Sequence, residues 1–242
     1  MSDTGIVTEW IELAVGDGVL SAYVARPDGP GEYPGVVVGH EIYGQHESLL
    51  AVTERLAGLG VIAILPDLFH RAAPRERLEW NAEGRERGLA LLRTLTRSDV
   101  VADVTACLGE LHRRAATSVH MVGFSAGGHA AVYAATQLPF ATVTAFSPGW
   151  LTNTDVPLST PEPTIESAAT ITGKLVLILG SQDPLVDADA RAVIANSLAE
   201  QRVNHEILIY DAPHSFTLPG RPAYREEYAE ETWSKLEALL HP

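Results

Sequence analysis

The sequence holds a single cysteine and no long apolar run. Cys107 has no partner for an intramolecular disulfide, and no stretch approaches the roughly 18 apolar residues of a membrane-spanning helix. The first residues, MSDTGIVTEWIEL, contain no basic region followed by an apolar segment, so we expect no signal peptide. These absences favour a cytoplasmic protein that does not associate with membranes.

Basic residues are also scarce. The chain has 17 Lys and Arg against 31 Asp and Glu, which gives a net charge of −14. This charge argues against nucleic acids and anionic membranes as partners, and it repels anionic substrates at long range. Seven of the fifteen arginines lie between Arg71 and Arg97, so a local exception is possible.

Sequence motifs for metal binding are missing as well. There is no H-E-x-x-H segment and no paired Cys/His pattern, and the six-residue spacing of His40 and His46 is not typical of a metal site. We therefore expect no metal and no other cofactor.

What the chain does have is enough apolar material for a folded domain. Its 242 residues are 46% hydrophobic, which suits one domain spanning 1–242 that buries roughly 70–75% of the surface of its unfolded chain. Alternating residues around Gly16-Asp17-Gly18 predict a two-stranded hairpin. Apolar runs then alternate with helical patterns, which predicts an α/β fold with a mostly parallel sheet and helices on both faces. The expected strands cover 33–40, 61–67, 118–124, 141–147, 174–180 and 204–210; the expected helices cover 47–60, 99–115, 127–137, 187–201 and 222–240; and 151–164 is expected to be a loop.

The segment Gly123-Phe-Ser-Ala-Gly-Gly128 fits the pattern G-x-S-x-G. Ser125 follows a predicted strand, at the edge where ligands bind in open α/β sheets. Gly123 and Gly127 leave room for a sharp turn that would expose the serine hydroxyl. On its own this pentapeptide could equally be a glycine-rich turn with an incidental serine.

Two more polar residues follow later strands in the order that a serine hydrolase needs. Asp183 comes just after 174–180, and His214 comes just after 204–210. In this fold class the order is nucleophile, acid, base, so we interpret Ser125, Asp183 and His214 as a catalytic triad. Asp187 is the rival acid, although its position suits the cap of the following helix.

These segments together resemble the dienelactone hydrolase family, a branch of the α/β-hydrolases. The resemblance runs from about Ile6 to Leu240 and is carried by HEIYG (40–44), PDLF (66–69), GFSAGG (123–128), GSQDPLV (180–186) and PHSF (213–216). It implies an α/β-hydrolase fold with Asp183 as acid and His214 as base. It also implies an oxyanion hole formed by the backbone N–H groups of Ile42 and Ala126.

The sequence departs from the type members of that family at the nucleophile. Those enzymes carry a cysteine there, and the glutamate that matches Glu41 helps to ready the thiolate. A thiol has a reference pKa of about 8.5, whereas an aliphatic alcohol is far less acidic. We therefore expect ordinary general-base activation of Ser125 by His214. Glu41 is then a hydrogen-bonding or positioning residue, or only a structural contact of its loop.

A second departure concerns substrate charge. The type members place an arginine four residues after the catalytic histidine to hold a substrate carboxylate, and here Leu218 stands at that position. A leucine cannot pair with a carboxylate. With the acidic net charge, this favours a neutral or more apolar ester or lactone.

The pocket could still receive a cation from the arginine-rich segment. Arg75/Glu79 and Glu83/Arg87 have the i,i+4 spacing of ion pairs on a solvated helix, which is the alternative reading of this segment. If one arginine faces substrate, Arg85 or Arg77 is the candidate. The remaining predicted pocket residues are Glu41, Tyr43, Trp80, Trp150 and Leu218.

The sequence thus predicts a serine hydrolase that cleaves a small ester or lactone through an acyl-enzyme. The same three residues could serve a lyase, cyclase or acyltransferase, and a non-catalytic binding protein on this scaffold is a further alternative. We expect a small-molecule substrate and a monomer or small homo-oligomer.

Overall fold

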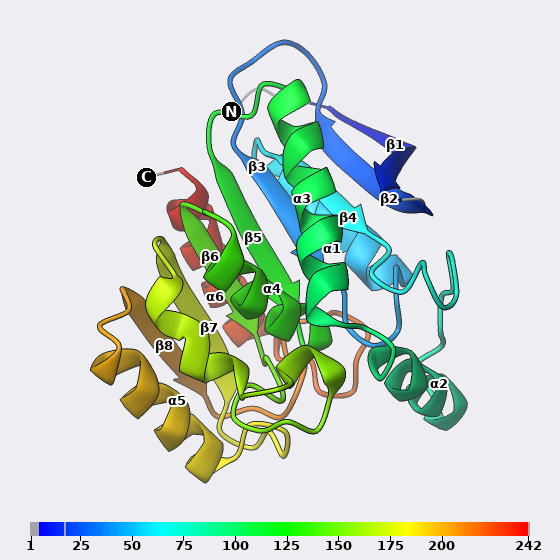
Figure 1. The fold of residues 1–242 in the computed structure, drawn as a ribbon. Helices are drawn as coiled ribbons and strands as arrows, with labels where there is room; N and C mark the ends of the chain where they lie inside the picture. The colour runs from blue at the N-terminus through cyan, green and yellow to red at the C-terminus, as the bar shows by residue number, and fades with distance from the viewer. Residues whose placement is uncertain (1–4, 17, 242) are drawn as a thin grey trace.

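Eight strands form one sheet in the computed structural model, which describes residues 5–16 and 18–241 (Figure 1). The order across the sheet is β1-β2-β4-β3-β5-β6-β7-β8. β2 pairs antiparallel with β1 and β4, whereas neighbours from β4 to β8 run parallel. The bounds are β1 Ile6–Val15, β2 Gly18–Pro27, β3 Gly35–Gly39, β4 Ile62–Pro66, β5 Val119–Phe124, β6 Thr142–Phe146, β7 Lys174–Gly180 and β8 His205–Tyr210.

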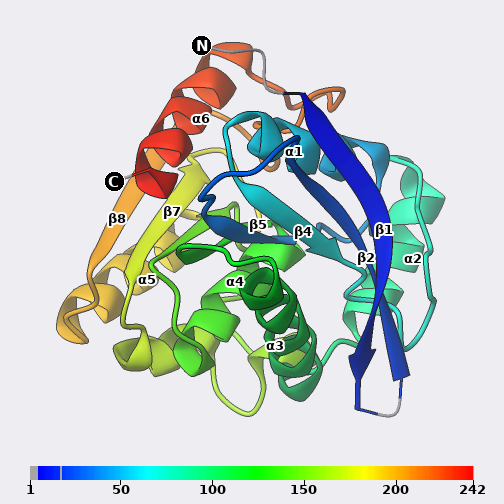
Figure 2. The same cartoon turned by 90° about the horizontal axis from the view of Figure 1, so that it is seen from above.

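Helices cover both faces of this sheet (Figure 2). One face carries α1 (Glu47–Gly58) and α6 (Glu226–Leu240), and the other carries α3 (Arg97–Arg113), α4 (Ala126–Gln137) and α5 (Ala188–Glu200). A further helix, α2 (Ala82–Leu92), lies against the loop that follows β3. Two short 3₁₀ helices, Pro157–Ser159 and Thr164–Thr170, lie between β6 and β7.

The apolar strands explain the two layers of the core. In β3, Val36 and Val38 pack with α1 and α6, while Val37 packs on the opposite face with α3 and α4. A strand buried on both faces needs a continuous apolar run because its side chains alternate between the faces. The predicted fold class, a mostly parallel α/β sheet with an antiparallel start and helices on both faces, is confirmed.

The hairpin and the long connection need qualification. β1 and β2 pair from Ile6↔Pro27 to Val15↔Gly18, and Asp17 in the predicted turn lies outside the described residues. The predicted loop 151–164 contains the first 3₁₀ helix and reaches the start of the second.

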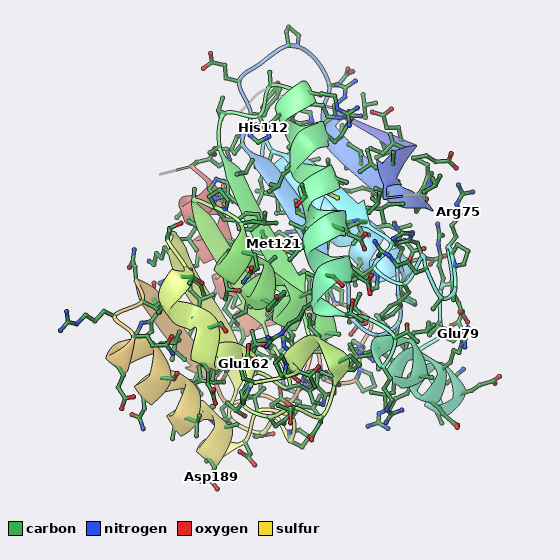
Figure 3. The ribbon with its side chains drawn as sticks, viewed as in Figure 1. Arg75, Glu79, His112, Met121, Glu162 and Asp189 are labelled. Carbon is green, nitrogen blue, oxygen red and sulfur yellow. The ribbon has the colours of Figure 1, made fainter. Side chains whose placement is uncertain are left out.

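One predicted helical ion pair is wrong. Arg75 and Glu79 lie on the irregular segment that precedes α2 (Figure 3), so they do not share a helix face. Arg75 instead pairs with Glu12 on β1, at 2.7 Å between Nη2 and Oε1. Arg87 does lie on α2, and its ion pair is with Glu76 at 2.8 Å.

The helices differ from membrane-spanning helices. Within residues 5–16 and 18–241, none of them combines the length and apolar character that a bilayer crossing requires.

Candidate active site

Polar side chains converge where the parallel strands end. The segments that follow β3, β5, β7 and β8 carry Glu41, Ser125, Asp183 and His214, respectively. Parallel neighbouring strands end at the same edge of the sheet, so these residues come together although Glu41 and His214 lie far apart in the chain. The site lies at the edge where open α/β sheets bind ligands.

Ser125 lies on a sharp turn between β5 and α4. Its backbone has φ 53° and ψ −113°, a conformation that L-residues rarely adopt, and its N–H donates to the carbonyl of Phe146 at 2.8 Å. The neighbouring glycines make the turn possible. A Cβ on Gly123 would lie 2.1 Å from the carbonyl oxygen of Gly127, and a Cβ on Gly127 would lie 2.2 Å from the backbone of Gly39. The segment therefore forms the sharp strand-to-helix turn that the sequence predicted, with Ser125 at its tip.

Hydrogen bonds connect the three predicted triad residues in a line. His214 Nε2 lies 2.9 Å from Ser125 Oγ, and His214 Nδ1 lies 2.7 Å from Asp183 Oδ2. Because a carboxylate only accepts, the proton lies on Nδ1, and Nε2 is left to accept from the serine hydroxyl. The Asp183 side chain is fully buried, and its other oxygen accepts from the N–H of Leu185 at 2.9 Å.

The rival acid has a different place. Asp187 caps the first turn of α5, where its Oδ1 accepts from the N–H of Ala190 at 2.9 Å. This matches the capping role that the sequence favoured for it. Asp183 is therefore the carboxylate that contacts His214.

The predicted oxyanion hole falls on two residues near Ser125: Ala126 follows it in the chain, and Ile42 lines the same cavity. Ala126 is the first residue of α4, and Ile42 belongs to the turn after β3; both residues are buried. Within the part of the chain that the structure describes, neither N–H donates to another protein group. The N-terminus of α4 also contributes the positive end of its helix dipole. This arrangement suits an anionic oxygen bound next to Ser125.

A buried ion pair forms one wall of the site. Glu41 is 1% exposed and pairs with Arg221, at 2.6 Å between Oε2 and Nη2, and its Oε1 accepts from Trp80 Nε1 at 3.1 Å. The Arg221 guanidinium lies over the rings of both Tyr43 and Trp80, 4.7 and 4.8 Å from their centroids. Burial of both charges requires this pairing, because an unpaired carboxylate at the same place would be costly.

A cavity of about 320 Å³ opens above Ser125. Four of the six predicted pocket residues, Glu41, Tyr43, Arg85 and Trp150, line it. Trp80 stands behind it as the partner of Glu41 and Arg221. The full lining is Glu41, Ile42, Tyr43, Arg85, Leu89, Ser125, Trp150, Leu185, His214, Arg221, Pro222 and Ala223.

The prediction that Leu218 lines the pocket is wrong. Its side chain is fully buried and packs in the apolar cluster beneath α1 and α6, away from the cavity. The arginine of this loop that does line the cavity is Arg221, seven residues after His214. Counting four residues from the histidine missed it because the loop between β8 and α6 is irregular. The only signal was an arginine within this loop.

The two candidate arginines of the arginine-rich segment separate clearly. Arg85 lies on α2 and lines the cavity. Arg77 lies over the ring of Trp10 on β1, 5.1 Å from its centroid, and does not line the cavity. Of the seven arginines between Arg71 and Arg97, Arg85 is therefore the one that lines the cavity.

Comparison with known proteins agrees with this architecture. A family model described as the dienelactone hydrolase family matches residues 20–242. The chain belongs to the dienelactone hydrolase family. Membership in this family makes it a hydrolase that acts on ester or lactone bonds.

Individual relatives cover most of the chain. A Synechocystis protein named "Putative carboxymethylenebutenolidase" is 31% identical over 230 residues, which are 91% of each chain. A Bradyrhizobium protein named "Probable 2-oxo-3-(5-oxofuran-2-ylidene)propanoate lactonase" is 27% identical over 97% of this chain and 94% of its own. A crystal structure of a "Putative Dienelactone Hydrolase" from Klebsiella pneumoniae superposes with a TM-score of 0.87 at 24% identity and covers 98% of both chains, which supports the fold.

Other histidines take structural positions around the site. His129, one turn into α4, is fully buried and lies 2.7 Å from Thr164 Oγ1; burial lowers its pKa to about 3. His46 caps α1 and stacks on Trp80. Among residues 5–16 and 18–241, no three or more His, Cys, Asp or Glu side chains are grouped so that they could hold a metal ion.

Proposed function

We propose that the protein is a serine hydrolase that cleaves a small ester or lactone through an acyl-enzyme. The observation that carries this proposal is the hydrogen-bonded line from Ser125 through His214 to Asp183 on a strained elbow. In the first step Ser125 Oγ attacks the carbonyl carbon while His214 Nε2 takes the hydroxyl proton. Asp183 holds the imidazole in the required tautomer and stabilises the imidazolium that forms.

The oxyanion of the tetrahedral intermediate binds to the N–H groups of Ile42 and Ala126. A single such donor is worth roughly 3–4 kcal/mol in the transition state. Collapse of the intermediate breaks the bond to the leaving oxygen, which takes the proton from His214. A water molecule, activated by the same histidine, then attacks the acyl-enzyme and releases the acid.

The charges at the cavity support a substrate that carries a carboxylate. Glu41 neutralises Arg221, whereas Arg85 forms no ion pair among the described residues, so the cavity has a net positive side. A carboxylate-bearing substrate replaces the neutral ester or lactone that we expected from Leu218 in the sequence. The name of the Bradyrhizobium relative includes a propanoate, which is a carboxylate, and this negative charge agrees with a cation at the cavity.

Turnover by paired substrates tests both parts of the proposal. Wild type should hydrolyse p-nitrophenyl acetate and Ser125→Ala should not; equal rates would refute the serine mechanism.

Arg85→Gln should raise KM for a carboxylate-bearing aryl ester more than tenfold and leave KM for its methyl ester unchanged. The matched control is Arg93→Gln, the exposed residue at the end of the same helix. If Arg85→Gln leaves KM for the carboxylate-bearing ester unchanged, carboxylate recognition by Arg85 is refuted.

A further inference from the structure

A buried imidazole connects the two loops that follow β3 and β4. His40, the residue before Glu41, is 1% exposed. Its Nδ1 lies 2.7 Å from the carbonyl oxygen of Glu41, and its Nε2 lies 3.0 Å from the backbone nitrogen of Leu68, just after β4. Its ring also contacts the edge of Phe69, at 4.8 Å between centroids. The imidazole is therefore fixed on three sides.

The chemistry of these partners determines the tautomer of His40. A carbonyl oxygen only accepts, so Nδ1 must donate; a backbone N–H only donates, so Nε2 must accept. The ring is consequently neutral with its proton on Nδ1. Burial lowers the pKa of His40, which agrees with the neutral form, although the nearby Asp67 carboxylate opposes this effect.

The Glu41 carbonyl belongs to the same peptide unit as the Ile42 N–H. A trans peptide is planar and directs its C=O and N–H to opposite sides. A bond that holds the carbonyl toward His40 therefore directs the N–H away from it, and the N–H of Gly44 adds a second bond to the same oxygen at 3.1 Å. The orientation of this peptide decides whether the Ile42 N–H can meet an oxyanion.

We propose that His40 is a positioning residue, whose neutral imidazole locks the Glu41–Ile42 peptide so that the Ile42 N–H faces the oxyanion that develops beside Ser125. This inference deepens the proposed serine mechanism and rests on it. The imidazole acts only through the Glu41–Ile42 peptide. The N–H of Leu68, in the loop after β4, holds the imidazole in place. Orientation of an oxyanion donor matters in the transition state and little in substrate binding, so the effect belongs to kcat.

Three variants separate positioning from packing. His40→Phe keeps a ring of similar size but removes both hydrogen bonds, and we expect kcat for p-nitrophenyl acetate to fall 10- to 100-fold with KM unchanged within twofold. His40→Gln keeps one donor and one acceptor, and it should recover most of kcat. The control is His70→Phe: His70 is also buried and bonds to Asp103 at 3.2 Å, but it has no contact with the Glu41 carbonyl. His70→Phe should lower stability without lowering kcat.

Nuclear magnetic resonance gives a readout that does not depend on turnover. The ¹⁵N shifts of His40 should show the proton on Nδ1, and the amide of Ile42 should shift between wild type and His40→Phe. A proton on Nε2, an unmoved Ile42 amide, or a His40→Phe variant with wild-type kcat would each overturn the inference. A His40→Gln variant as slow as His40→Phe would do so too. If wild type and Ser125→Ala are equally inactive, the serine mechanism fails, and the resonance data alone decide whether His40 holds the peptide.

Discussion

Replacing Arg221 with methionine removes the partner of a buried carboxylate. Glu41 is 1% exposed and Arg221 is 15% exposed at its side chain, so the pair is largely shielded from water. Removing one member of a buried pair typically costs about 3–5 kcal/mol, because the other charge is left without compensation. Trp80 Nε1 remains as one donor to Glu41, which places the expected loss near the lower end, about 3 kcal/mol. For a chain of this size that corresponds to a fall in Tm of about 6–12 °C.

A double variant shows whether the uncompensated charge is the cause. Glu41→Gln/Arg221→Met buries no charge and keeps an oxygen for Trp80, so it should recover about 2 kcal/mol relative to Arg221→Met alone. The measurement is urea-induced unfolding of wild type, both single variants and the double variant. An Arg221→Met variant that loses less than 1 kcal/mol, or a double variant that is no more stable than it, would refute the reasoning.

Three further expectations concern the triad, the loop after β3 and pH. Asp183→Asn should lower kcat about 10⁴-fold, because it favours the wrong tautomer of His214. Asp187→Asn keeps a good helix cap and should change kcat less than twofold. Similar losses in both variants would contradict the assignment of Asp183 as the acid of the triad. Gly88→Ala would place a Cβ 2.3 Å from a carbonyl oxygen of the loop after β3, so kcat should fall about tenfold. The control is Gly109→Ala, which has open space at its Cβ and should leave kcat unchanged while gaining up to about 1 kcal/mol of stability. Equal kcat values in the two variants would contradict this expectation. Because burial lowers the folded-state pKa of His129 to about 3, below its unfolded value near 6.5, the unfolded state binds more protons between these values. Stability should therefore fall by about 2 kcal/mol from pH 6 to pH 4 through this residue, and urea unfolding of His129→Leu should show a correspondingly smaller loss.

The strands, and the grouping of Ser125, Asp183 and His214 in space, could be predicted because their signals are local. Each buried strand is a continuous apolar run, and the polar residue that follows it must lie at the carboxyl edge of the sheet. Ser125, Asp183 and His214 each follow such a run. Three residues from distant parts of the chain could thus be grouped without any contact being known.

The wall of the cavity could not be predicted in the same way. Arg221 contacts Glu41 across 180 positions of the chain, from a loop whose path no periodic pattern records. Counting from His214 pointed to Leu218, which the fold buries in the apolar core. Helical spacing likewise paired Arg75 with a glutamate four residues on, although that segment is irregular. In each case the error came from assuming a local geometry that tertiary packing overrides.

Covalent labelling of Ser125 tests the central claim most directly. A fluorophosphonate probe added to wild type should give one phosphonyl adduct per chain, and peptide mass spectrometry should place it on Ser125. Ser125→Ala should remain unlabelled under the same conditions. Labelling of Ser125→Ala at the wild-type rate, or an adduct on another residue of the wild-type protein, would contradict the account.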